Sequence, residues 1–454
     1  MKLNYKRTFL IGLVFFSITM MSSLHDSLTP KILYSFGVGE TLIGTIMAAD
    51  NILAIVLMPT FGYLSDRLNT RFGKRKPFCF IGSIMAAIFL IMLPIADNQR
   101  NLMMFVVCLF FFLLSLATYR SPGVSVMSDV TPKPLRSKAN GIINLMGTLA
   151  GMIGIVFTSL FYKERILEWE YNAIGDKVPV LGADGLPILD NTVNNIGMYI
   201  GVAAIALIAM LIYSFVIDEN KLVKEREETE RRLGISGEEA VSENNKKQIL
   251  PKDEKRSMIL ILMSIFLWFF GYNAVITFFS NYATTVLGIS GGGFSKYLLV
   301  ANIGGVIAFL PAGIISGKIG RKKTILMGIS ILTTAFVLGI FMTKETPLLY
   351  VLFLLAGIGW ASINVNSLPM ITEFAETRSI GQFTGYYYFA SMSAQTLTPI
   401  IIGFLIENLS IGYRVMFIYA AVFLALSAIP ISFSKHGDGM TEVSGSILER
   451  FEDM

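Results

Sequence analysis

The sequence predicts an all-α membrane protein with about twelve transmembrane helices. Composition is the first reason: 54% of the 454 residues are hydrophobic and only 15% are charged, unlike a soluble globular protein. Periodicity along the chain is the second, because apolar runs of roughly 20 residues, long enough to cross hydrocarbon as helix, recur about twelve times. Soluble folds are therefore a poor hypothesis.

The apolar runs fall into two sets separated by a charged segment. We expect helices at Phe9–Tyr34, Leu42–Leu64, Phe78–Ile95, Leu102–Asp129, Gly141–Tyr162 and Ile196–Ile217, and then at Met258–Tyr282, Tyr297–Ser316, Thr324–Met342, Leu348–Ile371, Phe383–Ile406 and Val415–Phe433. The sets define two six-helix bundles, residues 1–217 and 258–434. Between them lies a linker, residues 218–257, with helical character over Glu225–Arg232, and residues 435–454 form a tail.

The distribution of charge orients the chain. The net charge is +5, but most basic residues fall in alternate loops, which the positive-inside rule places in the cytoplasm. They are Lys2, Lys6 and Arg7, the segment Arg67–Lys76, then Lys133, Arg136 and Lys138, and later Lys318 and Arg321–Lys323. We therefore expect both termini and the linker in the cytoplasm and no nucleic-acid partner. The first run is too long and too polar for a cleaved signal peptide.

One stretch, Gly62–Pro77, packs charge and glycine between two apolar runs. A block this basic cannot lie in hydrocarbon, so it must be a short cytoplasmic loop. Within it Asp66 is well placed to pair with Arg67 or Arg71. Asp129 lies beside Lys133 and Arg136 and is expected to latch onto the basic loops. The residues that we expect to gate the cytoplasmic side are therefore Asp66, Arg67, Arg71, Asp129 and Arg136.

This loop resembles the signature loop between helices 2 and 3 of the major facilitator superfamily. Its Ser65-Asp66-Arg67, Arg71-Phe72-Gly73 and Lys76-Pro77-Phe78 elements are similar to those of glycoside-pentoside-hexuronide:cation symporters and sucrose carriers, as is Leu28-Thr29-Pro30. The second half repeats the motif over Pro311–Lys323, with Gly317 where Asp66 would fall. The resemblance implies a major facilitator fold with a substrate site between the bundles, and cation-coupled uptake of a glycoside or oligosaccharide.

Several positions depart from the family pattern. Arg120 stands where melibiose carriers have a sugar-holding Asp, and Asn144 stands where they have an Arg. Ala54 and Met58 match the two carboxylates of their Na+ site, and Leu113 replaces a helix 4 Asp of plant sucrose carriers. The resemblance therefore favours H+ over Na+ as the co-transported cation, although Na+ stays possible. No cofactor or metal site is expected.

Ionisable residues inside the first two runs are the candidates for cation coupling. Asp26 follows His25 on a polar stripe of the first helix, and Asp50 lies near the middle of the second. A charge at such depth is costly and is more often functional than not. His25 and Asp26 could instead lie at the outer water interface, and Asp50 could make a buried hydrogen bond. Pro30 is expected to kink or end the first helix.

Polar and aromatic residues in the helices are candidates for substrate binding. Arg120 keeps its proton, so it needs a carboxylate or an anionic ligand group as a partner. We expect it to pair with Asp26 or Asp50 when the site is empty. Aromatic faces suit sugar rings and amides suit hydroxyls, although each could equally be helix packing. The candidates are Tyr119, Arg120, Asn144, Trp268, Tyr272, Asn273, Trp360, Asn364, Tyr388 and Gln395.

Three further features of the sequence concern packing and turns. Gly147 and Gly151 belong to a small, polar face of the fifth helix that lets helices approach closely. The outer loop could make a hairpin at Asp184-Gly185. Cys79 and Cys108 lie in apolar runs and are interpreted as core packing.

We expect a monomeric, proton-coupled symporter of a sugar or glycoside in the cell membrane, which works by alternating access. Export of amphiphilic compounds is the alternative within transporters. A polytopic membrane enzyme or sensor is the alternative from another class. An enzyme is disfavoured because His25 and His436 lie at opposite ends of the chain with no metal-ligand spacing.

Overall fold

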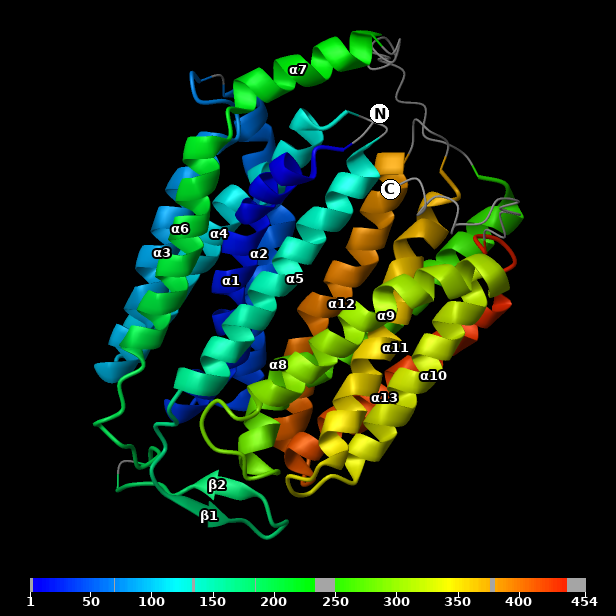
Figure 1. Ribbon diagram of the computed structural model, residues 1–454. Coiled ribbons are helices and arrows are strands. Elements are labelled where there is room, and N and C mark those ends of the chain that lie inside the picture. Colours follow the sequence, from blue (N-terminus) through cyan, green and yellow to red (C-terminus); the bar gives the residue numbers. More distant parts are fainter. Residues whose placement is uncertain are drawn as a thin grey trace. The chain divides into compact units, whose positions relative to one another are not determined.

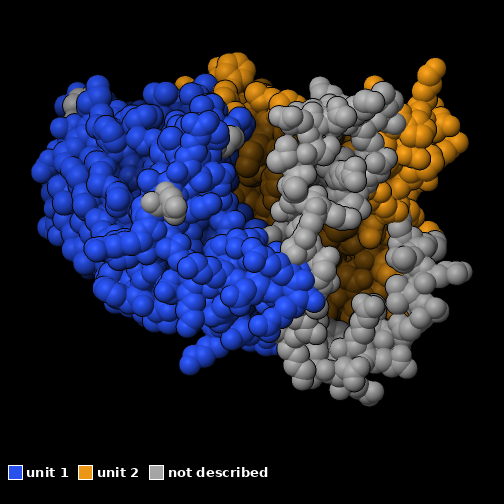
Figure 2. Space-filling model, turned by 90° about the horizontal axis from the view of Figure 1, so that it is seen from above, with its two compact units in different colours: residues 1–245, 277–299 blue, residues 246–276, 300–454 orange. Residues whose placement is uncertain are grey.

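The computed structural model describes residues 3–68, 70–132, 135–183, 185–232, 250–375 and 380–438. Within this part of the chain, 12 helices are long and apolar enough to cross a membrane, which confirms the predicted all-α membrane fold. The chain divides into two compact units, coloured separately in Figure 2. The first unit comprises residues 1–245 and 277–299, and the second comprises residues 246–276 and 300–454.

The first unit holds the six membrane helices of the N-terminal half (Figure 1). They are α1 Tyr5–Ser35, α2 Glu40–Arg67, α3 Lys76–Asn98, α4 Leu102–Val130, α5 Arg136–Phe161 and α6 Ile196–Val216. A further helix, α7 Glu219–Arg232, contains the stretch of the linker predicted to be helical. The two short strands of the outer loop are β1 Trp169–Tyr171 and β2 Lys177–Pro179.

The remaining helices belong wholly or partly to the second unit. They are α8 Lys252–Thr285, α9 Ser295–Ile319, α10 Arg321–Ile340, α11 Leu348–Thr372, α12 Ile380–Asn408 and α13 Val415–Phe433, with a 3-10 turn at Gly412–Arg414 before the last. The end of α8 and the start of α9, within residues 277–299, belong to the first unit.

Helix α1 does not end at its proline, contrary to one of the two outcomes expected there. It continues through Pro30 to Ser35. Proline has no N–H to donate to the carbonyl four residues before it, which here is that of Asp26. Membrane helices tolerate this loss because neighbouring helices, polar side chains, water and small local adjustments of the helix can supply new partners for the freed carbonyl.

The small face of α5 packs against α1, as its glycines predict. A Cβ added at Gly147 or Gly151 would lie 3.3 or 3.4 Å from the side chain of Thr19, and one at Gly154 would overlap Ser23. Thr19 and Ser23 belong to the same polar stripe of α1 as Asp26. They therefore face a neighbouring helix. Cys79 and Cys108 are both buried, as predicted.

The outer loop between α5 and α6 folds back on itself twice. β1 and β2 pair antiparallel with Trp169 opposite Pro179, and their turn contains Gly175 at φ 79°. A second reversal follows, closed by an antiparallel bridge between Leu181 and Pro187. The predicted Asp184-Gly185 hairpin falls in this second reversal, although Asp184 itself lies outside the described residues.

Candidate functional site

Three charged residues of the first unit act on one another inside the membrane helices. Asp26 on α1 is exposed although the residues on either side of it are buried. Asp50 on α2 and Arg120 on α4 are half-buried and close enough to Asp26 to interact with it electrostatically. Helices α1, α2 and α4 therefore gather two acids and one base, which we call the charged trio. Ionisable groups at such depth are typical of ion and substrate pathways.

The expected direct pairing of Arg120 with one of the two acids is absent. Among the described residues, no nitrogen–oxygen distance of 4.0 Å or less joins Arg120 to either carboxylate, and its guanidinium donates no hydrogen bond. A guanidinium has five donors and keeps its charge, so this arrangement leaves Arg120 able to bind an oxygen-rich group.

The other candidates of the first unit differ in accessibility. His25 is buried; its Nδ1 lies 2.9 Å from the Thr29 hydroxyl and its ring 6.0 Å from that of Phe112. Tyr119 is fully buried, with its side chain against Gly82 of α3. Asn144 on α5 is exposed. Of these three residues, only Asn144 is exposed enough for a small molecule to contact its side chain, as is the case for the charged trio.

In the second unit, four aromatic residues from three helices form one cluster. The rings of Tyr272 on α8 and Trp360 on α11 stack in parallel, 3.7 Å apart at 5°. Phe269 meets Trp360 edge to face at 5.1 Å and meets Tyr387 of α12 at 6.5 Å. Tyr272 and Trp360 are among the residues predicted from the sequence, whereas Phe269 and Tyr387 are not, although their aromatic character was a usable signal.

The remaining candidates of the second unit differ in accessibility. Trp268 is fully buried, and no described residue accepts a hydrogen bond from its indole N–H. Asn273 donates to the Phe269 carbonyl at 2.7 Å, and Gln395 donates to the Ser391 carbonyl at 3.4 Å. Tyr388 is 48% exposed and meets Tyr387 edge to face, and Asn364 is half-buried. Tyr388 and Asn364 are therefore more accessible than Trp268.

The loop after α2 is held by a residue that the sequence analysis did not single out, Arg75. Its Nε donates to Asp129 at 2.9 Å, its Nη1 donates to the Gly62 carbonyl at 3.2 Å and to Ser65, and its Nη2 donates to Asp66. The predicted pairing of Asp66 with Arg67 or Arg71 is therefore wrong. Asp129 does form an ion pair with the basic loop, as predicted, but its partner there is Arg75. The side chain of Arg136 lies outside the described residues.

Charge and burial compete at Arg75. Burial lowers the pKa of its guanidinium, but the hydrogen bond and charge of Asp129, together with Asp66, outweigh burial, so the pKa of Arg75 is raised above its ordinary value. Asp66 is 61% and Asp129 32% exposed as side chains, whereas Arg75 is 7% exposed. The guanidinium is thus the buried centre of the network.

A carboxylate from the start of α7 completes this loop. Glu219 is buried and accepts hydrogen bonds from the backbone N–H groups of Lys74, Arg75 and Lys76 at 2.8 to 3.0 Å. These groups open α3, where the helix dipole favours a negative charge. Gly73 precedes them at φ 115°, a conformation that favours glycine, with Glu219 against its Cα.

The second unit builds a similar loop after α9. Arg321 pairs with Glu373 at the end of α11, and the Lys322 N–H donates to the Asp438 carboxylate at 2.8 Å. Gly320, at φ 95°, comes immediately before. The sequence repeat predicted this second loop but not its acidic partners Glu373 and Asp438.

At the opposite end of the first unit, a buried lysine forms a second network. Lys31 is 3% exposed, pairs with Glu164 and donates to the Thr284 hydroxyl at 2.7 Å and the Gly291 carbonyl at 3.3 Å. Its ammonium also lies 5.3 Å from the ring centre of Phe294. Lys31 is not among the residues predicted from the sequence, although a lysine at the outer end of a predicted span runs against the positive-inside rule and was a usable signal.

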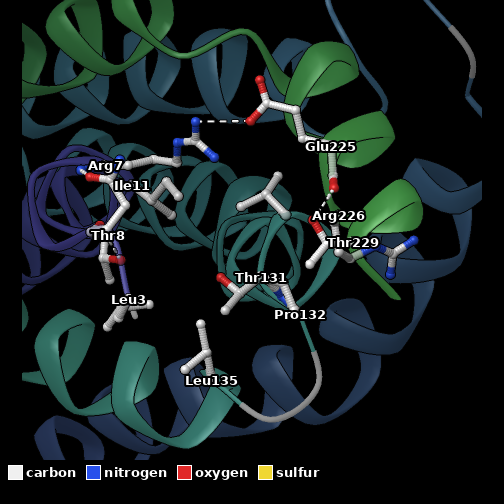
Figure 3. A pocket seen from close by; sticks show the side chains of 12 residues that line it. Leu3, Arg7, Thr8, Ile11, Thr131, Pro132, Leu135, Glu225, Arg226 and Thr229 are labelled. Carbon is white, nitrogen blue, oxygen red and sulfur yellow. Dashed lines mark hydrogen bonds and ion pairs between the residues drawn. The ribbon is translucent and has the colours of Figure 1, made fainter. Parts of the chain in front are cut away.

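A small cavity lies between the start of α1, the end of α4 and α7 (Figure 3). Its volume is about 140 Å³, and Arg7 reaches across its rim to Glu225 at 2.9 Å. This is less than half of the roughly 300 Å³ at which small-molecule pockets begin, so we do not assign substrate to it.

Comparisons with known proteins agree with the fold. Residues 11–394 and 297–439 match the family described as the Major Facilitator Superfamily. An uncharacterized MFS-type transporter of Methanocaldococcus jannaschii is 23% identical over 94% of both chains. A sucrose transport protein of Arabidopsis thaliana is 24% identical over 29% of this chain and 25% of its own length. A cis,cis-muconate transport protein of Acinetobacter baylyi is 26% identical over 45% of this chain and 49% of its own length.

Solved structures show the same fold at lower identity. A bacterial homolog of the human lysosomal transporter Spinster, inward-facing and unoccupied, has a TM-score of 0.68 and 15% identity, with 96% of this chain and 98% of that chain covered. The inward-open xylose transporter XylE of E. coli has a TM-score of 0.62 and 12% identity, with 99% and 98% covered. The chain belongs to the Major Facilitator Superfamily, and it is a multi-pass membrane transporter and not an enzyme.

Proposed function

We propose that the chain is a proton-coupled symporter of a sugar or glycoside in the cell membrane, within the sugar-carrier branch of the superfamily. The charged trio is the observation that carries this proposal. Two carboxylates lie together with an arginine that makes no ion pair or hydrogen bond within the described residues, inside membrane helices of the first unit. Such a cluster can take up or release a proton when its contacts with a ligand change. It needs no metal ion to do so.

Coupling follows from the charges of the trio. Arg120 supplies the one positive charge of the trio and interacts electrostatically with Asp26. When substrate oxygens bind the guanidinium, its field at Asp26 and Asp50 is weakened, and one carboxyl then favours the protonated form. Substrate and proton are therefore bound together. Asp50 is our first choice as the proton site because it is less exposed than Asp26.

Two further observations support a sugar as the substrate. The parallel stack of Tyr272 and Trp360 supplies the aromatic surface on which sugar rings bind in many proteins, and Asn364 adds an amide for hydroxyls. The sucrose transport protein and XylE are, by their names, carriers of a disaccharide and a pentose. Both are distant, so they support the substrate class and no single substrate.

Counterflow and accumulation in proteoliposomes test the proposal. Asp50→Asn and Asp26→Asn should each be examined for exchange of labelled sugar and for uptake under a pH gradient. If either acid carries the proton, its variant keeps counterflow and loses accumulation. Arg120→Ala should lose pH-driven uptake. Asp190→Asn, on the outer loop, removes a carboxylate outside the membrane and should keep both activities. Accumulation by all three trio variants would contradict the coupling scheme.

A substrate that carries a carboxylate is the second candidate, and the absence of a partner for Arg120 among the described residues favours it. A guanidinium binds a carboxylate through two parallel hydrogen bonds, a geometry that lysine cannot supply. The muconate transport protein, named for a dicarboxylate, fits this candidate. Arg120→Lys should then reduce uptake of an acidic sugar such as a hexuronide about tenfold or more, equivalent to about 1.4 kcal/mol, and neutral sugars less. Equal effects on both would favour the neutral substrate.

A further inference from the structure

Two arginines of the loop after α2 take no part in the Arg75 network. Arg67 and Arg71 are exposed, and neither makes an ion pair within the described part of the chain. Instead, the guanidinium of Arg67 lies over the Tyr63 ring at 4.3 Å and that of Arg71 over the Phe72 ring at 4.6 Å. The loop thus separates its cations into one buried structural arginine and two exposed arginines held on aromatic rings.

The residues around these arginines are apolar and exposed. Tyr63 is 54%, Leu64 45% and Phe72 53% exposed, and Leu68 lies between them in sequence. Tyr63, Leu64 and Arg67 are three and four residues apart on α2, so they share one face of the helix. We call Tyr63, Leu64, Arg67, Leu68, Arg71 and Phe72 the α2-end surface. Basic residues that contact only water do not require exposed apolar side chains around them.

The α2-end surface is held in place by hydrogen bonds. The Thr70 hydroxyl donates to the Gly73 carbonyl at 2.6 Å and accepts from the Phe72 N–H at 3.2 Å. The Asn220 amide of α7 donates to the carbonyls of Thr70 and Arg71 at 3.2 and 3.1 Å. These bonds fix the backbone that carries Arg71 and Phe72. Less conformational freedom is therefore lost when a ligand binds there.

We propose that the α2-end surface binds an anionic phospholipid of the cytoplasmic leaflet. Its phosphate lies between Arg67 and Arg71, where planar guanidinium groups donate paired hydrogen bonds to phosphate oxygens. Its acyl chains run along Leu64 and the ring of Tyr63 at the end of a membrane span. Asp66 is paired with Arg75, and the two exposed arginines outweigh the single excess negative charge that Asp66 and Asp129 together leave on the Arg75 network. The positive-inside rule places this end of α2 at the leaflet that carries the anionic lipids.

Lipid retention by the purified, delipidated full chain tests this proposal. Phosphatidylglycerol and phosphatidylcholine are each titrated in detergent, and bound lipid is counted by native mass spectrometry. The wild-type chain should prefer phosphatidylglycerol, and the double variant R67Q/R71Q should bind it on the order of 10-fold more weakly. R67K/R71K, which keeps the charge but loses the planar fork, should show a smaller loss.

The matched control is K318Q/K323Q, which removes two exposed lysines from the corresponding loop of the second unit. Neither lysine stacks on an aromatic ring among the described residues, so this variant should bind phosphatidylglycerol within about twofold of wild type. An equal loss in the control, or no preference in the wild-type chain, would overturn the proposal. Displacement of the lipid by millimolar glycerol 3-phosphate would also overturn it, because the site would then recognise free phosphate.

Discussion

The loops after α2 and α9 share one arrangement of residues but differ in their number of charged side chains. In each, a glycine at positive φ lets the chain turn, an arginine pairs with an acid at the end of another helix, and a distant carboxylate receives the N–H groups that open the next helix. The first loop adds a second acid, Asp66, so that Arg75 joins two carboxylates. The second has Gly317 at that place and leaves Arg321 with one.

Burial of the two arginines follows the number of their partners. Arg75, with two carboxylates, a carbonyl and a hydroxyl, is 7% exposed, whereas the side chain of Arg321 is 26% exposed. A guanidinium leaves water at low cost only when nearly all of its donors are bonded. The first loop is therefore the more rigid structure, and the variants below measure how far the two loops differ.

Removal of the central arginine should have the largest effect. Arg75→Ala leaves Asp66 and Asp129 facing each other without a cation and should lower the free energy of unfolding by about 3 kcal/mol. Arg321→Ala should cost less than about 1 kcal/mol, because that pair is more exposed. Unfolding by SDS titration in mixed micelles measures both. Similar losses in the two variants would show that partner number does not distinguish the loops.

Removal of the distant carboxylates should come next. Glu219→Ala strips the acceptor from three backbone N–H groups and should cost about 2 kcal/mol, whereas Asp438→Ala, with one side-chain bond to the Lys322 N–H, should cost about 1 kcal/mol. The same titration compares them. Glu219→Gln, which keeps an oxygen acceptor, is the control and should lose less than Glu219→Ala. A larger loss for Asp438→Ala would reverse the comparison.

The extra acid of the first loop should matter more for transport than for stability. Asp66 is exposed, so Asp66→Ala should cost less than about 1 kcal/mol of stability. It should nevertheless cut the transport rate severalfold and leave substrate affinity largely intact, because Arg75 would be braced by Asp129 alone. Rates and half-saturation concentrations at equal expression decide the matter. Unchanged turnover would remove the gating role from Asp66.

Adding the missing acid to the second loop should have the smallest effect. A Cβ added at Gly317 would meet no atom within 4 Å, so the aspartate of Gly317→Asp begins in open space. We expect a change in the free energy of unfolding within about 0.5 kcal/mol, since any new pair with Arg321 would be exposed. A stabilisation above about 1 kcal/mol would show that a second carboxylate suffices to rebuild the first loop.

Much of the fold could be predicted because lipid leaves few choices. Backbone groups in hydrocarbon must bond within their own helix, so an apolar run of sufficient length determines a helix almost alone. The positions of Asp26, Asp50 and Arg120 inside such runs identified the charged trio by the same logic. The rotation of each helix could not be predicted. Trp268 lies on a helix that is apolar all round, so periodicity does not indicate which face is buried.

The sequence by itself therefore determined the twelve helices, the two basic loops and the presence of charge within the first two spans and α4. Which charged residues pair with one another follows only from the folded structure. Glu219 reaches the Lys74 N–H across 145 residues of chain, and Asp66 finds Arg75 and not its neighbour Arg67. The physical reason is that electrostatic pairing depends on distance in space. That distance is set by the turn at Gly73 and by the packing of α2, α4 and α7, which no local pattern records.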